Sequence, residues 1–316
     1  MKFKNFFNAG LAVVCLSLVY SCSEDDQETP ENSESYNTKV SITDAPIDNS
    51  NVQAAFITIS EVKVNGNSIE AFQKTTVNIS SLQNGNSELL GNLDLESGTT
   101  SQITLVLDNE SDASGEAPGN YILTADDEKK ALVATSGIIE ITDNLEIQAV
   151  ENNEIVLDFD LRKAIVEDQS SGEYKFVSET ELGNSIRAVN SLETGIISGS
   201  VSNMNSSDAE TMVAFAYKKG TYTESEAGSE NNVGFSNAVS SSSVTKADGD
   251  FELHFIEAGE YELHFASFSD TNSDGSMEFE GMLDASSATA IDLQEFSVEA
   301  NAEIAVEVVL AGLLGL

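Results

Sequence analysis

Short runs in which apolar and polar residues alternate make up most of the chain after residue 38. Side chains of a strand point alternately to its two faces, so a period of two is typical of strands with one buried face. Asn, Gly, Asp and Ser separate the runs, as in the turns between antiparallel strands. The pattern therefore predicts an all-β fold of two antiparallel β-sandwich domains in tandem. First-domain strands are expected at residues 39–43, 53–64, 75–79, 101–107, 121–124, 137–141, 145–150 and 154–161.

The boundary between the two predicted domains falls in a short polar stretch at residues 190–194. The first β domain is therefore expected at residues 38–190 and the second at residues 191–316. Helical periodicity is scarce, and its clearest instance is residues 80–95, whose leucines would suit a short helix or a packed loop. Second-domain strands are expected at 195–201, 212–217, 243–245, 250–256 and 260–266, with a polar insertion at 218–239.

Residues 1–21 are predicted to be a signal peptide. Lys2 and Lys4 give a basic start, and the apolar stretch at residues 10–20 is too short to span a bilayer. The sequence VYSC at residues 19–22 resembles the lipobox of bacterial lipoproteins, although its Tyr is larger than the usual residue at that place. The resemblance implies that Cys22 becomes the new N-terminus and carries a diacylglyceryl lipid. The alternative is an ordinary signal peptide cut near an incidental cysteine.

Residues 22–37 are expected to be an acidic, flexible tether, because they have almost no apolar side chain to bury. The sequence SEDD at residues 23–26 resembles the acidic export tag that directs lipoproteins of Bacteroidetes-type bacteria to the outer face of the outer membrane. The predicted location is therefore the outer membrane, with the protein anchored to it by lipid and exposed at the cell surface.

The charge and cysteine content exclude several classes of function. The chain has 54 Asp and Glu residues against 14 Lys and Arg, which gives a net charge of −40. Such a surface repels phosphate backbones, so nucleic acid is excluded as a partner, and an attracted ligand should be neutral or cationic. Cys15 lies in the predicted signal peptide and Cys22 is the predicted lipidation site, which leaves no thiol for a disulfide, a metal or catalysis.

The first domain resembles the domain-of-unknown-function family numbered 4382. The resemblance covers about residues 38–190 and departs at SGTTS (97–101), where members of the family tend to have a Gly-x-Tyr step. The family occurs in secreted and lipid-anchored bacterial proteins, and the resemblance implies no known activity. The matching segments are VSITDAP (40–46), AFITISEVKV (55–64), SQITLVL (101–107), IVLDFD (155–160) and IR (186–187).

The second domain is similar to the carboxypeptidase regulatory-like modules of bacterial surface proteins. GIISGSV at residues 195–201, ADGDF at 247–251 and AGEYEL at 258–263 carry this resemblance. It implies a prealbumin-type β-sandwich that serves as an accessory domain. It implies no particular activity, because such sandwiches host unrelated roles.

Three acidic residues of the first domain are candidates for a functional role. Asp44 lies two residues before Pro46, so its carboxylate can accept backbone N–H groups in a turn, and the alternative is a ligand-binding role. Asp158 and Asp160 flank Phe159 on a predicted strand, which places both carboxylates on one face and the ring on the other. Such a pair suits acid–base chemistry, but the abundance of acidic residues favours a solvated strand face.

The chain's two histidines lie in matching sequences. ELHF occurs at residues 252–255 and again at 262–265, on either side of Gly259. A hairpin turn at Gly259 would set His254 and His264 opposite each other on neighbouring strands. They would then form a cross-strand packing pair or, with carboxylates completing the ligand set, a two-histidine metal site.

A calcium site is predicted at the loop DTNSDGSME, residues 270–278. Its oxygen side chains are spaced as in EF-hand loops, and Gly275 stands where the chain must turn sharply. Gly281 takes the place of the usual bidentate Glu, and Glu280 is the expected substitute. The alternative is a polar turn without an ion. The expected Ca²⁺ ligands are Asp270, Asn272, Asp274, Ser276, Glu278 and Glu280.

Together these features predict a surface lipoprotein that acts as a non-catalytic binding or adhesion module, with calcium stabilising the second domain. The expected partners are the membrane, through the lipid, and an extracellular glycan or protein. No catalytic residue is predicted. The alternatives are a carboxylate-based glycoside hydrolase and a structural or assembly component of an envelope complex. The chain has no Trp to stack on a sugar ring, which counts against both glycan-directed functions.

Overall fold

The computed structural model describes residues 34–45, 49, 51–100, 102–168, 171–204, 210–227, 234–273, 275 and 277–314. The predicted signal peptide, Cys22 and most of the predicted tether lie outside these residues. Glu34–Leu316 forms one compact unit, in which each of the two β domains has a hydrophobic core of its own. Within the described residues, no helix is long and apolar enough to cross a membrane.

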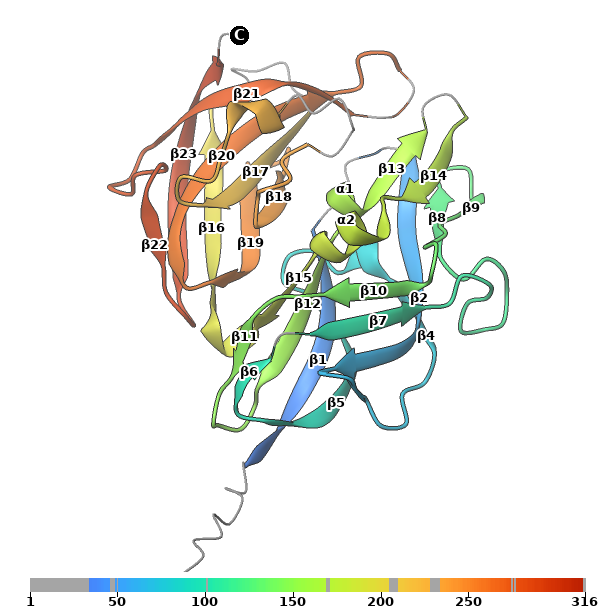
Figure 1. The fold of residues 1–316 in the computed structure, drawn as a ribbon. Coiled ribbons are helices and arrows are strands. Elements are labelled where there is room, and N and C mark those ends of the chain that lie inside the picture. The colour runs from blue at the N-terminus through green and yellow to red at the C-terminus, as the bar shows by residue number, and fades with distance from the viewer. Residues whose placement is uncertain are drawn as a thin grey trace, which may run out of the picture. The chain divides into compact units, whose positions relative to one another are not determined.

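The first domain is built from two sheets that enclose one core (Figure 1). One sheet has the strand order β15 (Ile186–Asn190), β12 (Glu154–Asp160), β1 (Ser35–Ala45) and β5 (Glu88–Glu96). The other has the order β10 (Ile138–Ile141), β7 (Ile103–Leu107), β2 (Val52–Val64), β8 (Tyr121–Thr124) and β9 (Lys129–Ala131), and β3 (Asn67–Ser68) and β4 (Thr75–Asn78) also pair with β2.

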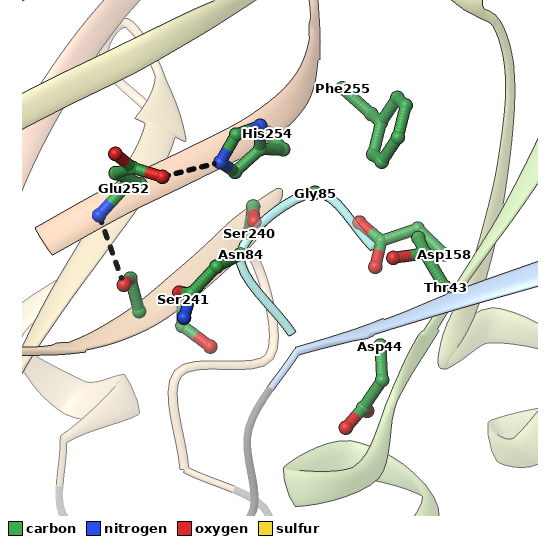
Figure 2. A pocket seen from close by; sticks show the side chains of 11 residues that line it. Thr43, Asp44, Asn84, Gly85, Asp158, Ser240, Ser241, Glu252, His254 and Phe255 are labelled. Carbon is green, nitrogen blue, oxygen red and sulfur yellow. Dashed lines mark hydrogen bonds and ion pairs between the residues drawn. The ribbon is translucent and has the colours of Figure 1, made fainter. Parts of the chain in front are cut away.

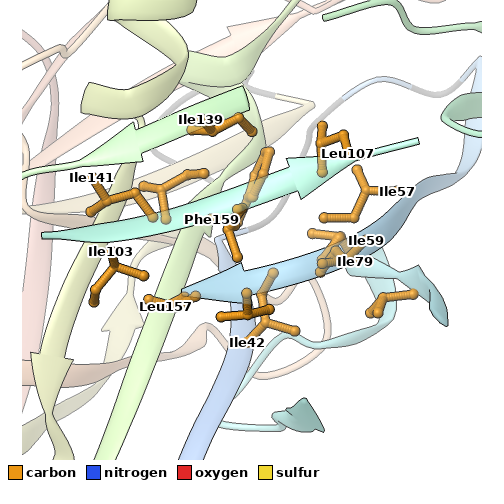
Figure 3. Close-up of a cluster of buried hydrophobic side chains, with 14 of the residues drawn as sticks. Ile42, Ile57, Ile59, Ile79, Ile103, Leu107, Ile139, Ile141, Leu157 and Phe159 are labelled. Atoms are coloured by element: carbon orange, nitrogen blue, oxygen red, sulfur yellow. The ribbon is translucent and has the colours of Figure 1, made fainter. Parts of the chain in front are cut away.

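Alternating apolar residues of these strands fill the space between the two sheets (Figure 3). Ile42 and Phe159 come from the first sheet and Ile57 and Ile103 from the second, and all four are almost fully buried. Burying side chains of this size stabilises a fold by about 1.5–3 kcal/mol each. The period-two pattern thus predicted these strands together with their buried faces.

Short elements complete the first domain. The helix α1 (Leu161–Ala164) follows β12 directly, and α2 (Glu179–Asn184) begins at a capping box in which Ser178 and Glu181 each accept the other's backbone N–H. The remaining elements are η1 (Ile79–Ser81), the paired strands β6 (Gly98–Thr100) and β11 (Leu145–Ile147), and the paired strands β13 (Ile165–Asp168) and β14 (Glu173–Phe176).

The second domain is one continuous sheet that wraps around its own core. Its strand order is β18 (Ser240–Val244), β17 (Thr211–Lys218), β20 (Gly259–Ser269), β21 (Glu278–Ser287), β23 (Glu303–Leu313), β16 (Thr194–Ser202) and β19 (Asp250–Glu257), and β22 (Phe296–Val298) pairs with β20. The two ends of this order, β18 and β19, lie against each other. The short η2 (Ser191–Glu193) joins β15 to β16.

The insertion between β17 and β18 contributes to a separate hydrophobic cluster on this sheet. Phe235 stacks on Phe215 of β17 with ring centres 4.1 Å apart, and Tyr222 stacks on His264 of β20 at 3.9 Å. Phe235 belongs to a cluster distinct from the main core of the domain, and Tyr222 packs against it. The aromatic residues of a mostly polar segment therefore cover strands that would otherwise expose apolar side chains.

Three details of the fold differ from the sequence predictions. The predicted tether is too long at its end, because Ser35 to Asn37 already pair with β5. Residues 80–95, predicted to form a short helix or a packed loop, contain most of strand β5, since Leu93 and Leu95 alternate into the core while Leu89 is 58% exposed. The sheets are not purely antiparallel, because β1–β12 and β16–β23 run parallel. Parallel neighbours arise where the chain crosses between layers before it returns, which local patterns do not report.

Truncating the ring at the centre of the first core should destabilise the protein strongly. Phe159→Ala removes a fully buried side chain and is expected to lower the free energy of unfolding by about 3–5 kcal/mol. Leu89→Ala, at an exposed position of β5, is the control and should cost less than about 0.5 kcal/mol. Urea unfolding of both variants measures the difference, and equal losses would contradict the assignment of the core.

Candidate functional site

The two carboxylates that flank Phe159 on β12 lie in a buried charged cluster. As predicted, Phe159 points into the core while Asp158 and Asp160 share the opposite face. The prediction that this face is solvated is wrong, because Asp158 is only 6% exposed and Asp160 only 7%. Residues of the second domain cover them, which a local sequence pattern has no means to report.

Arg187 neutralises Asp158 and reaches the second domain. It lies opposite Asp158 in the β12–β15 register, and its Nη2 is 2.6 Å from Asp158 Oδ2. Its Nη1 donates to the carbonyl of Phe255 at 2.7 Å. Burial raises the pKa of Asp158, and the positive charge of Arg187 opposes that shift. One guanidinium thus compensates a buried carboxylate and fastens the second domain.

A backbone irregularity accompanies this contact. In the β16–β19 register, Gly195 pairs with Ile256 and Ile197 with Leu253, so β19 bulges between them. Phe255 lies in the bulge with φ +55°, a conformation that costs energy for a bulky residue. Bulges redirect backbone groups, and the carbonyl of Phe255 accepts the hydrogen bond from Arg187.

The cations of α1 make further contacts across the junction. Asp160 caps α1 by accepting the N–H of Arg162 at 3.1 Å, and its other oxygen lies 3.3 Å from Lys163 Nζ. Lys163 donates to the carbonyl of Ala238 at 2.6 Å. The guanidinium of Arg162 donates to the hydroxyls of Ser241 and Ser243. The chain has only two arginines, and both bridge the domains here.

Asp44 completes the set, which we call the junction cluster: Asp44, Asp158, Asp160, Arg162, Lys163 and Arg187. Asp44 is 6% exposed, and among the described residues neither of its carboxylate oxygens has a hydrogen-bond partner. The predicted turn hydrogen bonds are therefore not found in the described part of the chain, and Pro46 lies outside it. Burial raises the pKa of Asp44 well above its usual range, and Asp160 and Asp158 raise it further, whereas Arg162 opposes the shift.

A small cavity lies between the domains beside this cluster. Its volume is about 20 Å³, which is room for about one water molecule. Figure 2 shows Gly85 between His254 and Asp158, with the carboxyl of Asp44 directed away from both. Gly85 has φ +73°, and a Cβ there would lie 2.6 Å from His254 Nδ1, so only glycine fits this approach. The cavity is lined by Thr43, Asp44, Asn84, Gly85, Asp158, Ser240, Ser241, Ser242, Glu252, His254 and Phe255.

A second cavity of about 230 Å³ lies on the other side of Asp158 and shares Ser240 with the first. Asp158, Asp160, Lys163 and Arg187 all contribute to its wall. The Nε of Arg187 is buried and has no hydrogen-bond partner among the described residues. Both cavities are smaller than the roughly 300–1,000 Å³ that small-molecule sites usually provide.

The histidines are not neighbours across a hairpin. β19 pairs with β16, and β20 pairs with β17, β21 and β22, so the predicted hairpin at Gly259 is wrong. His254 contacts Glu252 at 2.9 Å, whereas His264 is partly buried and stacks on Tyr222, with Glu262 at 3.4 Å. The cross-strand pair and the two-histidine metal site both depended on that hairpin. Burial lowers the pKa of His264, and Glu262 opposes the shift.

The predicted calcium loop is only partly described, since Asp274 and Ser276 lie outside the described residues. Gly275 has φ +88°, as the sharp turn requires, and its N–H donates to Asp270 at 2.9 Å. The Glu278 carboxylate accepts hydrogen bonds from Thr271 and Asn272, and Glu280 accepts one from Ser267. Within the described residues, no group of three His, Cys, Asp or Glu could hold a metal. Calcium binding therefore stays a prediction.

Comparison with known proteins supports the resemblance of the first domain. Residues 37–178 match DUF4382, a domain of unknown function. The junction-cluster residues Asp44, Asp158, Asp160, Arg162 and Lys163 lie within the matched residues 37–178, and Arg187 follows them. No curated protein matches the chain in sequence. The similarity of residues 191–316 to carboxypeptidase regulatory-like modules stays a prediction.

Solved structures of limited similarity include the Bacillus anthracis TIE protein, the Bacillus cereus major pilin subunit BcpA and a candidate adhesin from Bacteroides ovatus. Their identities are 10%, 12% and 10%, with TM-scores of 0.18, 0.21 and 0.18. The alignments cover 87%, 88% and 93% of this chain and 33%, 70% and 94% of those chains. The chain thus spans about a third of the TIE protein. At these scores the likenesses assign no function.

Removing the cation beside Asp158 should destabilise the protein far more than removing an exposed one. Arg187→Met leaves a buried carboxylate without its partner, at an expected cost of about 3–5 kcal/mol. The double variant Arg187→Met/Asp158→Leu should recover much of that loss, because both charges are gone. Lys63→Met breaks a more exposed 2.9 Å pair with Glu61 and should cost at most about 1 kcal/mol. Denaturant unfolding compares the three, and a double variant no better than Arg187→Met would contradict the pairing.

If the loop at residues 270–280 binds calcium, the ion should stabilise the second domain. Millimolar Ca²⁺ should raise a melting transition of soluble residues 23–316 by the equivalent of about 1–2 kcal/mol, given the affinity typical of extracellular sites. Asp270→Ala and Asp274→Ala should each abolish the rise. The control is Asp292→Ala, because Asp292 also accepts a backbone N–H in a turn. Scanning calorimetry with and without chelator measures the shift, and an unchanged trace would contradict calcium binding.

Proposed function

We propose that the protein is a lipid-anchored module at the outer face of the outer membrane that binds an extracellular glycan or protein without catalysing a reaction. The observation that carries this proposal is the junction cluster. Its cations are engaged in holding two β domains together, so the charged groups at the centre of the molecule have a mechanical role.

The geometry counts against the alternative of a glycoside hydrolase. A hydrolytic carboxylate pair must reach a scissile bond with a sugar ring between the two groups. Here Asp158 is paired with Arg187, and Asp160 caps α1 and contacts Lys163. The cavity that Asp158 and Asp160 both line has a volume of about 230 Å³, which is below the roughly 300–1,000 Å³ of usual small-molecule sites. The contacts of these carboxylates therefore favour a role in stabilising the fold over a role in catalysis.

The proposed anchor and the start of the fold define how far the module can extend from the membrane. Twelve residues, 23–34, separate Cys22 from the first strand residue, Ser35. A flexible segment of this length has a root-mean-square reach of about 20 Å. Two domains fastened to each other on such a tether would present a binding surface beyond the lipid headgroups.

The expected partner is neutral or positively charged. Removal of residues 1–21 would take Lys2 and Lys4 away and leave a net charge of −42. Both arginines and Lys163 are used at the junction, which leaves the outer surface still more acidic. Long-range attraction therefore favours a basic protein surface over an anionic polysaccharide.

Two measurements on the same protein test the proposal. The full-length chain expressed in its host should incorporate labelled fatty acid and be accessible to protease on intact cells, and Cys22→Ser should abolish the labelling. The soluble chain of residues 23–316 should bind a glycan array or basic surface proteins without turning over glycoside substrates. Hydrolysis that Asp158→Asn abolishes and Glu110→Gln, at an exposed carboxylate, leaves intact would overturn the non-catalytic proposal.

A further inference from the structure

Strand β5 leaves one edge of a first-domain sheet unpaired. It is the last strand in the order β15, β12, β1, β5 (Figure 1), and among the described residues it pairs with β1 alone. The end strands elsewhere in the three large sheets have a neighbour against them: β15 lies beside β11, β10 beside α2, β9 beside β14, and β18 beside β19. A long unpaired edge is a template on which another strand can add.

The register of β1 and β5 shows which backbone groups of β5 face outward. In an antiparallel pair, residues that exchange hydrogen bonds alternate with residues whose N–H and C=O groups face away from the partner. Ser97, directly after β5, donates its N–H to the carbonyl of Glu34, so these two form a hydrogen-bonded pair. Continuing the alternation, the N–H and C=O groups of Asn92, Asp94 and Glu96 point away from β1, toward the free edge.

A cavity lies beside the same strand, at the rim of the first core. Its volume is about 370 Å³, which is within the usual range of binding pockets. Residues 69–75 form one wall and residues 89–92 of β5 form the other. Ile69 belongs to the core, Leu90 packs against it, and Leu89 is 58% exposed. A strand added to β5 would direct alternate side chains to the core side of the sheet, where this cavity can hold an apolar one.

The charge of the outer face of β5 selects the kind of partner. Asn92, Asp94 and Glu96 are all exposed on that face, and Asp94 accepts a hydrogen bond from Asn37 of β1 at 3.1 Å. Lys39 shares the face but stands on β1, one strand further from the free edge. A second copy of the chain on this edge would set acids opposite acids, which is destabilising, whereas Lys or Arg opposite the acids is stabilising.

We infer that the free edge of β5 binds an extended segment of a partner protein by strand addition. The segment carries Lys or Arg at alternate positions, opposite Asp94 and Glu96. On its other face it carries an apolar side chain that enters the cavity beside Leu89. The inference rests on the proposed function, because it names the place and the form in which an extracellular protein is bound.

Short synthetic peptides test the inference on the soluble chain of residues 23–316. A peptide of alternating Lys and Val should bind, and a peptide of alternating Glu and Val should not. The Lys–Val peptide methylated at every backbone nitrogen keeps its charge but can donate no strand hydrogen bond. It should bind at least about tenfold more weakly than the unmethylated peptide. Titration calorimetry measures the three affinities.

Variants of β5 show whether the Lys–Val peptide occupies the edge. Asp94→Pro removes an outward N–H, a change that an edge strand tolerates, and should weaken peptide binding by at least about tenfold. Asp94→Lys should also weaken it, because a like charge then lies opposite the peptide. Glu307→Lys, at an exposed position of β23, is the matched charge control and should change the affinity less than about twofold. Melting curves identify any variant that fails to fold, and the methylated peptide tests the edge without a variant.

Equal affinity for the methylated and unmethylated peptides would overturn strand addition, and so would equal affinity of Asp94→Pro and the parent chain. A dimer that Asp94→Pro dissociates would mean that a second copy takes the edge. Peptide binding only after removal of residues 23–33 would mean that the chain's own N-terminal segment takes it. Either result would overturn the inference.

The same variants separate this inference from the proposed function. Peptide binding that Asp94→Pro abolishes would support the edge site even if the parent chain bound no natural glycan or protein, a result that would overturn the proposed function alone. Basic surface proteins bound equally by Asp94→Pro and the parent would overturn the edge site and leave the proposed function standing.

Discussion

The burial of Asp158 and Asp160 is the constraint on which the joining of the two domains depends. A carboxylate removed from water destabilises a fold unless a cation and hydrogen bonds compensate it. The elements next to β12 supply the compensation, because β15 places Arg187 opposite Asp158 and α1 places Lys163 beside Asp160. Each of these cations has further N–H groups, and these donate hydrogen bonds to backbone carbonyl groups of the second domain. One set of charges therefore satisfies the buried acids and joins the domains.

The junction differs physically from the cores on either side of it. Each core is apolar and closely packed, so its stability changes little with pH or salt. The junction contains charges, hydroxyl groups and cavities large enough for water, so its stability depends on ionisation and on ionic strength. Polar interfaces of this kind permit relative motion of domains more readily than apolar ones do. A module whose domains are joined in this way can present a binding surface and can also change the relative position of its two domains.

Local sequence patterns predicted some features of the candidate site and missed others. The alternation Asp158–Phe159–Asp160 predicted which side chains share a face, since the geometry of a strand determines it locally. It did not predict that the acidic face is buried, because the covering residues Ala238 and Phe255 lie about eighty residues or more further along the chain. The Glu-Leu-His-Phe repeats misled in the same way. They are alike in sequence, but β19 and β20 pair with different strands. A signal for the junction was present in the composition, since a chain with only two arginines would be expected to use them where a fixed, multivalent cation is needed.

The sequence by itself determined the all-β class, most of the strands of the first domain and the sign of the surface charge. Each of these follows from local periodicity, turn residues or a sum over residues. Only the tertiary structure decided that β1 pairs in parallel with β12, that Asp44 is buried without a hydrogen-bond partner in the described chain, and that Arg162 and Arg187 join the domains. These features depend on contacts between residues far apart in the chain, and local patterns carry no information about which distant segments will meet.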